Sequence, residues 1–268
     1  MDEKAKYRQL RGSLGLIFAA IWIVFWWMRI DAEKCVGCET CVPYCNVGAI
    51  SMRDGMAVVD EKVCVECWVC YRNQICPQDC FEPTPLTTPG DVFKHVLSDP
   101  TVTSEGTGVP GRGTEEAKTN DVTGRFSADT YGICIDMGRP GVGTYMRDVE
   151  KVAMAVAGAG VRFASPKETP LSGLMTDIRT GKISDEYLPV HVLSVIIEGT
   201  CKRDNLGPVL QALLKVAKEI DTVFSLGIVS LAAGDQDEPL FKTLQQYGLA
   251  KPARGKVNVG LGKPLYKG

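Results

Sequence analysis

The sequence has little of what usually marks an enzyme or a nucleic-acid-binding protein. Its 30 Lys and Arg residues against 32 Asp and Glu residues give a net charge of −2, so charge alone does not attract the chain to nucleic acid. Only two histidines are present, His95 and His191, and neither has an acidic residue or a serine at a telling spacing. The sequence therefore identifies no catalytic residue, and no nucleic-acid partner is expected.

Long apolar runs are also scarce. One uncharged stretch of seventeen residues, 12–28, follows a basic N-terminal segment. A membrane span needs about 20 apolar residues, with roughly 17 as the lower limit. No small-residue cleavage site follows, so a secretory signal is not expected. Three interpretations stay open: an extension that precedes a first strand at Met28, a membrane-associated helix, or a helix packed against a partner subunit.

Cysteine is present but unevenly distributed. Of eleven cysteines, nine lie between residues 35 and 80, while Cys134 and Cys201 stand alone in apolar segments. Metal ligation explains this pattern better than the disulfides of a small secreted protein. Because thiolate ligands need a reducing compartment, the sequence predicts a cytoplasmic protein, with membrane association through residues 12–28 as an open option.

The clustered cysteines form two similar runs. The first has the spacing C-x2-C-x2-C-x3-C, and the second repeats its first three members twenty-nine residues later. Three closely spaced thiolates hold one corner of a cubane cluster, and in two-cluster proteins the fourth cysteine of each run ligates the other cluster. The prediction is two [4Fe-4S] clusters, one held by Cys35, Cys38, Cys41 and Cys76 and the other by Cys64, Cys67, Cys70 and Cys45.

Residues 29–82 resemble bacterial two-cluster ferredoxins in these runs, with two departures. Five residues rather than three precede Cys76, and Asn46 rather than proline follows Cys45. The proline after Cys76 favours it over Cys80 as the eighth ligand, which leaves Cys80 as a spare thiol. Paired structural zinc sites are the alternative, but a triple C-x2-C-x2-C run suits separate four-ligand zinc sites poorly. Because all eight thiolates are consumed as ligands, the expected chemistry is one-electron transfer.

The sequence divides into four parts: a hydrophobic segment over 1–28, a two-cluster domain over 29–82, a Gly/Thr/Pro-rich connector over 83–125 and a C-terminal domain over 126–268. Within the cysteine-rich part, Asp54-Gly55 between two short apolar runs predicts a β-hairpin. The connector is expected to contribute one short helix, DVFKHVLSD, and no core.

The C-terminal part alternates strand and helix patterns. The strand patterns are TYGICIDMG, VRFA, HVLSVIIEGT and TVFSLGIVSLA, with KVNVGLGKP as a last strand. Of the two amphipathic helices between them, the second places Leu210, Leu213, Leu214 and Ala217 on one face. The order predicts an α+β fold, namely a ferredoxin-like sandwich behind the small two-cluster domain, with a small parallel α/β sheet as the alternative.

Two glycine-rich segments are candidate binding sites for an anionic cofactor or substrate. Backbone amides at a helix start, with a guanidinium nearby, can hold a carboxylate or a phosphate. The candidate residues are Gly111 and Arg112 in the connector and Gly138, Arg139, Gly141 and Gly143 between a strand and a helix. No Gly-Lys-Ser/Thr follows the first segment, which excludes a P-loop. A flexible connector and a tight turn that needs glycines are the respective alternatives.

Three further segments are similar to the N-terminal portion of 6-hydroxynicotinate reductase and related anaerobic ferredoxin-fused proteins: GVPGRGTEEAKTNDVTGRF, MGRPGVGTYMRDVEKV and IDTVFSLGIVS. With the cysteine runs, the resemblance covers about residues 29–265. It implies an iron-sulfur oxidoreductase component of anaerobic metabolism that passes low-potential electrons to a small anionic heteroaromatic substrate or to reductase subunits. That enzyme is a flavoprotein with a longer chain, so a flavin is expected on a partner. A redox-sensing or small-molecule-binding module without catalysis is the alternative.

Overall fold

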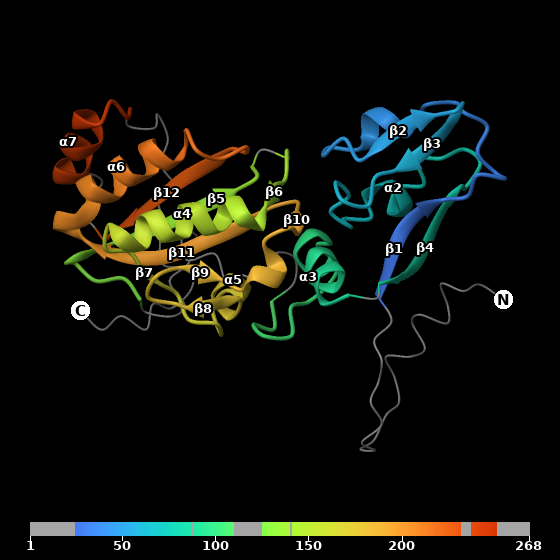
Figure 1. The fold of residues 1–268 in the computed structure, drawn as a ribbon. Helices are drawn as coiled ribbons and strands as arrows, with labels where there is room; N and C mark the ends of the chain where they lie inside the picture. Colours follow the sequence, from blue (N-terminus) through green and yellow to red (C-terminus); the bar gives the residue numbers. More distant parts are fainter. Residues whose placement is uncertain (1–24, 87, 110–124, 140, 232–236, 251–268) are drawn as a thin grey trace, which may run out of the picture.

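The computed structural model describes residues 25–86, 88–109, 125–139, 141–231 and 237–250 (Figure 1). Short elements surround the cysteine runs: β1 (Phe25–Ile30), η1 (Val42–Tyr44), β2 (Ile50–Arg53), β3 (Met56–Val59), α2 (Val69–Arg72), β4 (Phe81–Leu86) and α3 (Pro89–Ser98). β1 pairs antiparallel with β4, from Phe25 opposite Leu86 to Ile30 opposite Phe81. This pairing joins the chain before the first clustered cysteine to the chain after the last one.

The predicted hairpin is confirmed. β2 and β3 pair antiparallel and end with Arg53 opposite Met56. The two residues between them, Asp54 and Gly55, have φ values of 50° and 78°. A two-residue turn of type I′ needs positive φ at both central positions, which Asp-Gly supplies at low cost.

The hydrophobic N-terminal segment lies mostly outside the described residues, which begin at residue 25. The end of the uncharged run, residues 25–28, belongs to β1, so a helix that extends through Met28 is wrong. Aromatic residues favour strands, and this stretch has a partner strand to pair with. Within the described ranges, no helix is long and apolar enough to cross a membrane.

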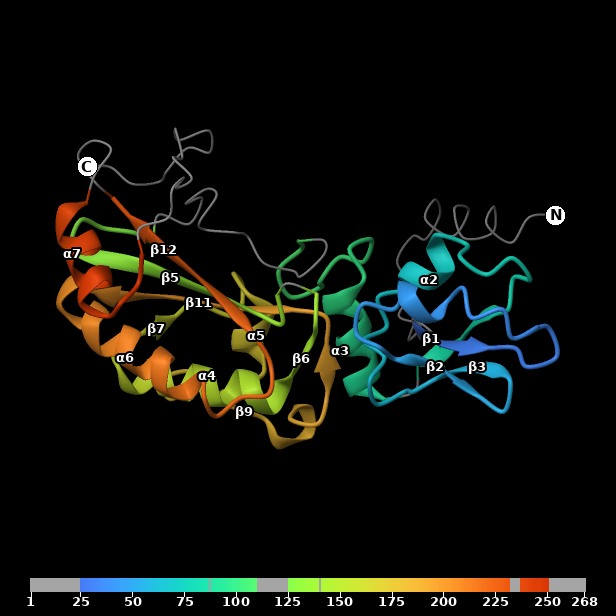
Figure 2. The ribbon, with the colours of Figure 1, turned by 90° about the horizontal axis from the view of Figure 1, so that it is seen from above.

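The start of the predicted connector is more ordered than the sequence indicated. Residues 83–86 belong to β4, and α3 follows with Thr88 as its N-cap, because the Thr88 hydroxyl accepts a hydrogen bond from Asp91 N at 3.1 Å. The short helix is confirmed, but its second half is buried. Figures 1 and 2 show α3 between the cysteine-bearing elements and the larger sheet, so it is packed on both sides. Residues 110–124 lie outside the described part of the chain.

The remaining described residues form an α+β unit. Its elements are β5 (Thr130–Met137), β6 (Thr144–Tyr145), α4 (Met146–Gly158), β7 (Arg162–Phe163), α5 (Pro170–Gly173), β8 (Met175–Asp177), β9 (Lys182–Ile183), η2 (Asp185–Tyr187), β10 (His191–Val192), β11 (Val195–Lys202), η3 (Arg203–Asn205), α6 (Leu206–Val216), β12 (Phe224–Ser230) and α7 (Glu238–Gln246). The main sheet has the order β12-β5-β11-β7, and every neighbouring pair is antiparallel. The α+β prediction is confirmed and the parallel-sheet alternative is wrong. The units β5-α4-β7 and β11-α6-β12 interleave as two split βαβ motifs.

Helices α4 and α6 cover one face of this sheet (Figure 2). Alternate residues of each strand point to the same face, so β5 directs Ile133 and Ile135 toward the helices. They pack there with Val152 of α4 and Leu210 of α6, and each of these four residues is at most 1% exposed. Fully burying such a side chain stabilises the fold by about 1.5–3 kcal/mol relative to leaving it exposed.

Three details of this unit correct the sequence interpretation. HVLSVIIEGT is two strands, since β10 pairs with β6 and β11 pairs with β5 and β7. The break falls at Leu193, whose amide donates to Ser98 Oγ of α3 at 3.1 Å instead of joining a ladder. The buried stripe of α6 consists of Leu206, Val209, Leu210, Leu213 and Val216. Leu214 and Ala217, which the sequence placed on the same face as Leu210, lie beside this stripe and are exposed. The predicted last strand, residues 256–264, lies outside the described residues.

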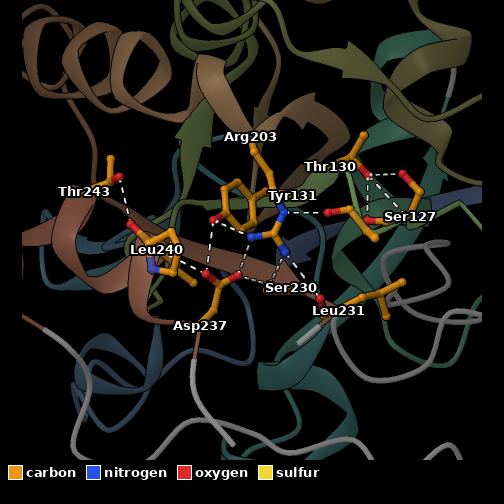
Figure 3. A network of polar contacts seen from close by, with 11 residues as sticks. Ser127, Thr130, Tyr131, Arg203, Ser230, Leu231, Asp237, Leu240 and Thr243 are labelled. Atoms are coloured by element: carbon orange, nitrogen blue, oxygen red, sulfur yellow. Dashed lines mark hydrogen bonds and ion pairs between the residues drawn. The ribbon is translucent and has the colours of Figure 1, made fainter. Parts of the chain in front are cut away.

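A polar network closes the end of the sheet beside α7 (Figure 3). Arg203 donates to Tyr131 Oη at 3.0 Å and to Asp237 Oδ2 at 2.8 Å. It also donates to Ser230 Oγ at 3.1 Å. Asp237 caps α7 by accepting a hydrogen bond from Leu240 N at 3.1 Å. One guanidinium thus links β5, β12 and the start of α7.

We expect Arg203→Ala to lower the free energy of unfolding by about 2 kcal/mol at pH 7, because Asp237, whose side chain is 6% exposed, loses its cation. Burial alone would raise the pKa of Asp237, but the hydrogen bonds it accepts, first that from Ser230, lower the pKa below its usual value. Because the folded-state pKa is lower than the unfolded value of about 3.9, the ionised carboxylate stabilises the fold at any pH above that value. This stabilisation is lost as the pH falls through the folded-state pKa. The difference between variant and wild type should therefore shrink in acid. Urea unfolding at pH 7 and near pH 3 measures both effects.

The matched control is Arg179→Ala, which removes an ion pair to Asp177 in which the arginine side chain is 87% exposed. An exposed pair of this kind contributes at most about 0.5 kcal/mol. Equal losses in the two variants would contradict a structural role for the Arg203 network.

Candidate metal centre

The clustered cysteines line two separate cavities. The first has about 310 Å³ of empty space, part of it open to solvent, and is lined by Cys35, Cys38, Cys41, Cys76 and Cys80 together with apolar residues. The second has about 510 Å³ and is lined by Cys45, Cys64, Cys67 and Cys70. The fourth cysteine of the first run thus lies with the second run, and Cys76 lies with the first. These are the two sets that the spacing predicts, with Cys80 added to the first.

The donor set fits iron-sulfur clusters. Every cysteine in the described ranges is a free thiol, and four thiols around one cavity are the ligand set of a [4Fe-4S] cluster. Backbone amides already donate to two of the sulfurs, Ala49 N to Cys45 Sγ at 3.2 Å and Ala57 N to Cys35 Sγ at 3.4 Å. Hydrogen bonds to sulfur are among the features that set cluster potentials. Among the described residues, no three His, Cys, Asp or Glu side chains converge as the ligands of a single metal ion do, whereas the four thiols of a [4Fe-4S] cluster each bind a different iron.

The duplicated aspartates shape both cysteine loops in the same way. Asp31 O accepts a hydrogen bond from Cys35 N at 3.1 Å, and Asp60 O accepts one from Cys64 N at 2.8 Å. The side chain of each aspartate also accepts from the amide two residues on, at 2.9 Å in both copies. This Asx-turn holds the chain as it enters the loop, so the repeat seen in the sequence is a repeat of turn geometry.

One glycine position in the first loop is sterically required. Gly37 has a φ of 68°, and a Cβ atom added there would lie 2.3 Å from Gly55 O. A side chain would therefore push the first cysteine loop away from the hairpin turn. The close approach places the β2–β3 hairpin against the wall of the first cavity.

Burial shifts the pKa values of three thiols at the second cavity. Burial raises the pKa of the Cys64 and Cys67 thiols and that of Cys70 to about 12. At the first cavity burial likewise raises the pKa of Cys41 and that of Cys80 to about 12, while hydrogen bonds from Thr40 lower the pKa of the exposed Cys38. Metal ligation requires thiolates, and burial keeps the thiols of the second cavity protonated. Cluster binding at the second cavity must therefore release the thiol protons.

A buried carboxyl group supports the second cysteine loop. Glu66 is 2% exposed and accepts hydrogen bonds from Met28 N at 2.9 Å and from Trp68 Nε1 at 3.2 Å. Burial raises the pKa of Glu66. It connects β1 to the loop between Cys64 and Cys67.

Elements after the cysteine runs reach the second cavity. Leu193 lines it directly. His191 and His95 contact backbone carbonyls of the second loop, His191 Nδ1 to Val63 O at 2.6 Å and His95 Nδ1 to Glu66 O at 2.8 Å. Both rings are buried, and burial lowers their pKa values. The sequence offered neither histidine a partner at a telling spacing, and no spacing in the sequence indicates their common target.

The glycine-rich candidate segment between β5 and α4 forms a turn. Gly138, Gly141 and Gly143 have positive φ values of 78°, 41° and 77°, which explains their presence without a ligand. Arg139 is exposed. The first amides of α4 are used by the protein itself, since Met146 N donates to Val190 O at 2.9 Å and Arg147 N donates to Leu188 O at 3.1 Å. Those two amides are not available to an anion.

The other two candidate residues, Gly111 and Arg112, lie outside the described residues. The lone thiols are core residues, Cys134 and Cys201 being 1% and 2% exposed. Burial raises the pKa of Cys201 to about 11, so the neighbouring Lys202 and Arg203 do not activate it.

The comparisons with known proteins converge on the cysteine-rich part. The 4Fe-4S binding domain family matches residues 28–51. Ferredoxin-2 of Chlorobaculum tepidum is 42% identical over 53 residues, which are 18% of this chain and 84% of that protein. A ferredoxin-like protein in the vnf region of Azotobacter chroococcum is 35% identical over 60 residues, 21% of this chain and 92% of that protein. Ferredoxin YfhL of Escherichia coli is 36% identical over 55 residues, 20% of this chain and 62% of that protein. No solved structure gives a significant match.

Each of these matches covers about a fifth of the chain. A match to ferredoxins agrees with the cysteine-lined cavities of this chain. Through its cysteine-rich part, the chain belongs to the ferredoxin family of 4Fe-4S electron-transfer proteins.

Proposed function

We propose that the chain is a two-cluster electron carrier fused to a C-terminal α+β unit. Cluster I would be held by Cys35, Cys38, Cys41 and Cys76, and cluster II by Cys45, Cys64, Cys67 and Cys70. The observation that carries the proposal is the sorting of the thiols into two cavities, with Cys45 crossing to the second and Cys76 to the first. When bound, the clusters supply one-electron transfer at low potential.

The residues around the cavities have distinct tasks. The thiolates hold iron, and the amides of Ala49 and Ala57 orient and partly neutralise sulfur. At the second cavity, apolar side chains including Met28 and Trp68 exclude water. Exclusion of water and hydrogen bonding to sulfur are the means by which a protein sets a cluster potential.

The two cavities differ in what can approach them. At the first, Cys38 is exposed and Val36 is 66% exposed, so a redox partner protein can come close to cluster I. At the second, Leu193 and the His191 ring come from the α+β unit. Electron exchange with a separate protein is therefore proposed at the cluster I side, and exchange with the α+β unit or a subunit docked there at the cluster II side.

The finer function that we propose is an oxidoreductase component of anaerobic metabolism. The resemblance to 6-hydroxynicotinate reductase supports reduction of a small anionic heteroaromatic acid, with any flavin on a partner subunit. The second candidate is a redox-sensing or ligand-binding module, which the occupied amides at the start of α4 do not favour. Incubating the dithionite-reduced full chain and its copurifying subunits with heteroaromatic acids separates the two. Electron consumption supports the reductase, and binding without consumption supports the sensor.

Anaerobic purification or reconstitution is expected to give about eight irons and eight acid-labile sulfides per chain, because eight thiolates ligate two cubanes. Iron and sulfide analysis measures this directly. About four irons per chain, or zinc in place of iron, would contradict the two-cluster proposal.

The eighth ligand is tested by a matched pair of variants. Cys76→Ser is expected to lose cluster I, so that about four of the eight irons remain. Cys80→Ser is expected to keep about eight, because the proline after Cys76 favours Cys76 as the ligand and leaves Cys80, which directly precedes β4, as the spare thiol. Metal analysis and EPR of the reduced proteins measure the difference. Iron loss in Cys80→Ser with full retention in Cys76→Ser would reverse the assignment.

A further inference from the structure

The only two histidines of the chain both bind the second cysteine loop. Neither lies in the cysteine-rich part: His95 is in α3 and His191 begins β10. We propose that His95 and His191 are positioning residues for cluster II, through which α3 and the α+β unit set the reduction potential of that cluster and leave cluster I unaffected. This inference rests on the proposed two-cluster function.

His191 is fixed in one orientation. Its Nδ1 lies 2.6 Å from Val63 O, and because a carbonyl can only accept, Nδ1 carries the hydrogen. The ring stacks on Tyr145 at 4.5 Å between centroids, and the Arg147 guanidinium lies 3.9 Å from the Tyr145 centroid. Gly143 makes the position possible, since a Cβ atom there would lie 2.5 Å from His191 Nε2. The glycine turn thus has a purpose that does not involve an anion: it makes room for this ring.

His95 holds the next part of the same loop. Its Nδ1 donates to Glu66 O at 2.8 Å, and its ring lies 4.7 Å from the Trp68 ring, centroid to centroid. Trp68 in turn donates to the Glu66 carboxyl group. The residue is 4% exposed, so the contact is shielded from water.

The two acceptors have a common relation to the cluster ligands. Val63 and Glu66 each precede a ligand, Cys64 and Cys67, so each histidine polarises the peptide group that leads into a ligating cysteine. In the first copy of the repeat, the equivalent carbonyls belong to Lys34 and Gly37, twenty-nine residues earlier. No histidine remains to bind them. The first three cysteines of the two copies have the same spacing, but the histidines bind the loop of the second copy alone.

The expected effect follows from charge. A cluster becomes more negative on reduction, and an N–H dipole directed at the loop that holds it favours the added electron. Groups that orient metal ligands from outside the first coordination shell commonly change metal affinity by about 10–100-fold when mutated. Removal of either donor should make cluster II harder to reduce, while cluster I keeps its potential.

The test is an EPR-monitored redox titration of the anaerobically reconstituted full chain. In His191→Leu and in His95→Leu, we expect the reduction equilibrium of one of the two clusters to become about three- to tenfold less favourable, where tenfold equals about 59 mV for a one-electron couple. His191→Asn should restore most of the shift, because its amide nitrogen can donate from nearly the position of Nδ1. Arg179→Ala is the control: it removes an exposed ion pair to Asp177 in the α+β unit, touches neither the second cysteine loop nor the second cavity, and should leave both potentials unchanged.

Selective loss of about four irons in His191→Leu, with retention in His191→Asn, would equally support the positioning role. Unchanged potentials in both leucine variants, or an equal shift of both clusters, would overturn it. A wild-type chain that holds only one cluster would instead overturn the two-cluster proposal, so the two failures are distinguishable.

Discussion

The bond between iron and cysteine thiolate is the interaction on which the N-terminal part of the structure depends. Among the described residues, the buried apolar cluster of this part is small and contains Met28, Cys41, Ile50, Ala57, Ile75 and Phe81, one of which is itself a thiol. A domain of about 60 residues buries too little surface for comfortable stability, and smaller cores usually need a metal or disulfides. Every cysteine in the described ranges is a free thiol, and on the proposed function cluster ligation would supply the missing free energy and couple folding to cluster binding.

That constraint explains how the surrounding elements are used. β1 and β4 pair across the base of the cysteine loops and tie the two ends of the module together. Beyond them, α3 begins three residues after the end of β4, and Arg72 of α2 forms an ion pair with Asp99 at the end of α3. The module is therefore anchored on the side of its second cysteine loop, where His95 and His191 reach it, and remains open on the side of Cys38. A carrier with one open side and one anchored side is suited to connect a mobile partner with a fixed acceptor.

The sequence predicts those structural features that depend on residues close together in the chain. The cysteine spacing, the duplicated aspartates and Asp54-Gly55 act over a few residues, so the sets of thiols and the hairpin could be inferred. The strand-helix alternation likewise gave the α+β class. The bond from His191 to Val63 could not be foreseen, because 128 residues separate its ends and no spacing relates them. The sequence leaves the glycine turn open between a ligand site and a tight turn, because it does not show that the first α4 amides are bound by residues 188 and 190 or that a ring fills the space beside Gly143.

The central claim is that two clusters are held by crossed sets of cysteines, with cluster II next to the α+β unit. Anomalous scattering at the iron edge, from crystals of the anaerobically prepared full chain, tests it most directly. The account predicts two centres of iron density, one inside the cavity of Cys35, Cys38, Cys41 and Cys76 and the other inside the cavity of Cys45, Cys64, Cys67 and Cys70 beside Leu193. A single centre, or Cys45 bound to the same iron cluster as Cys35, would contradict it.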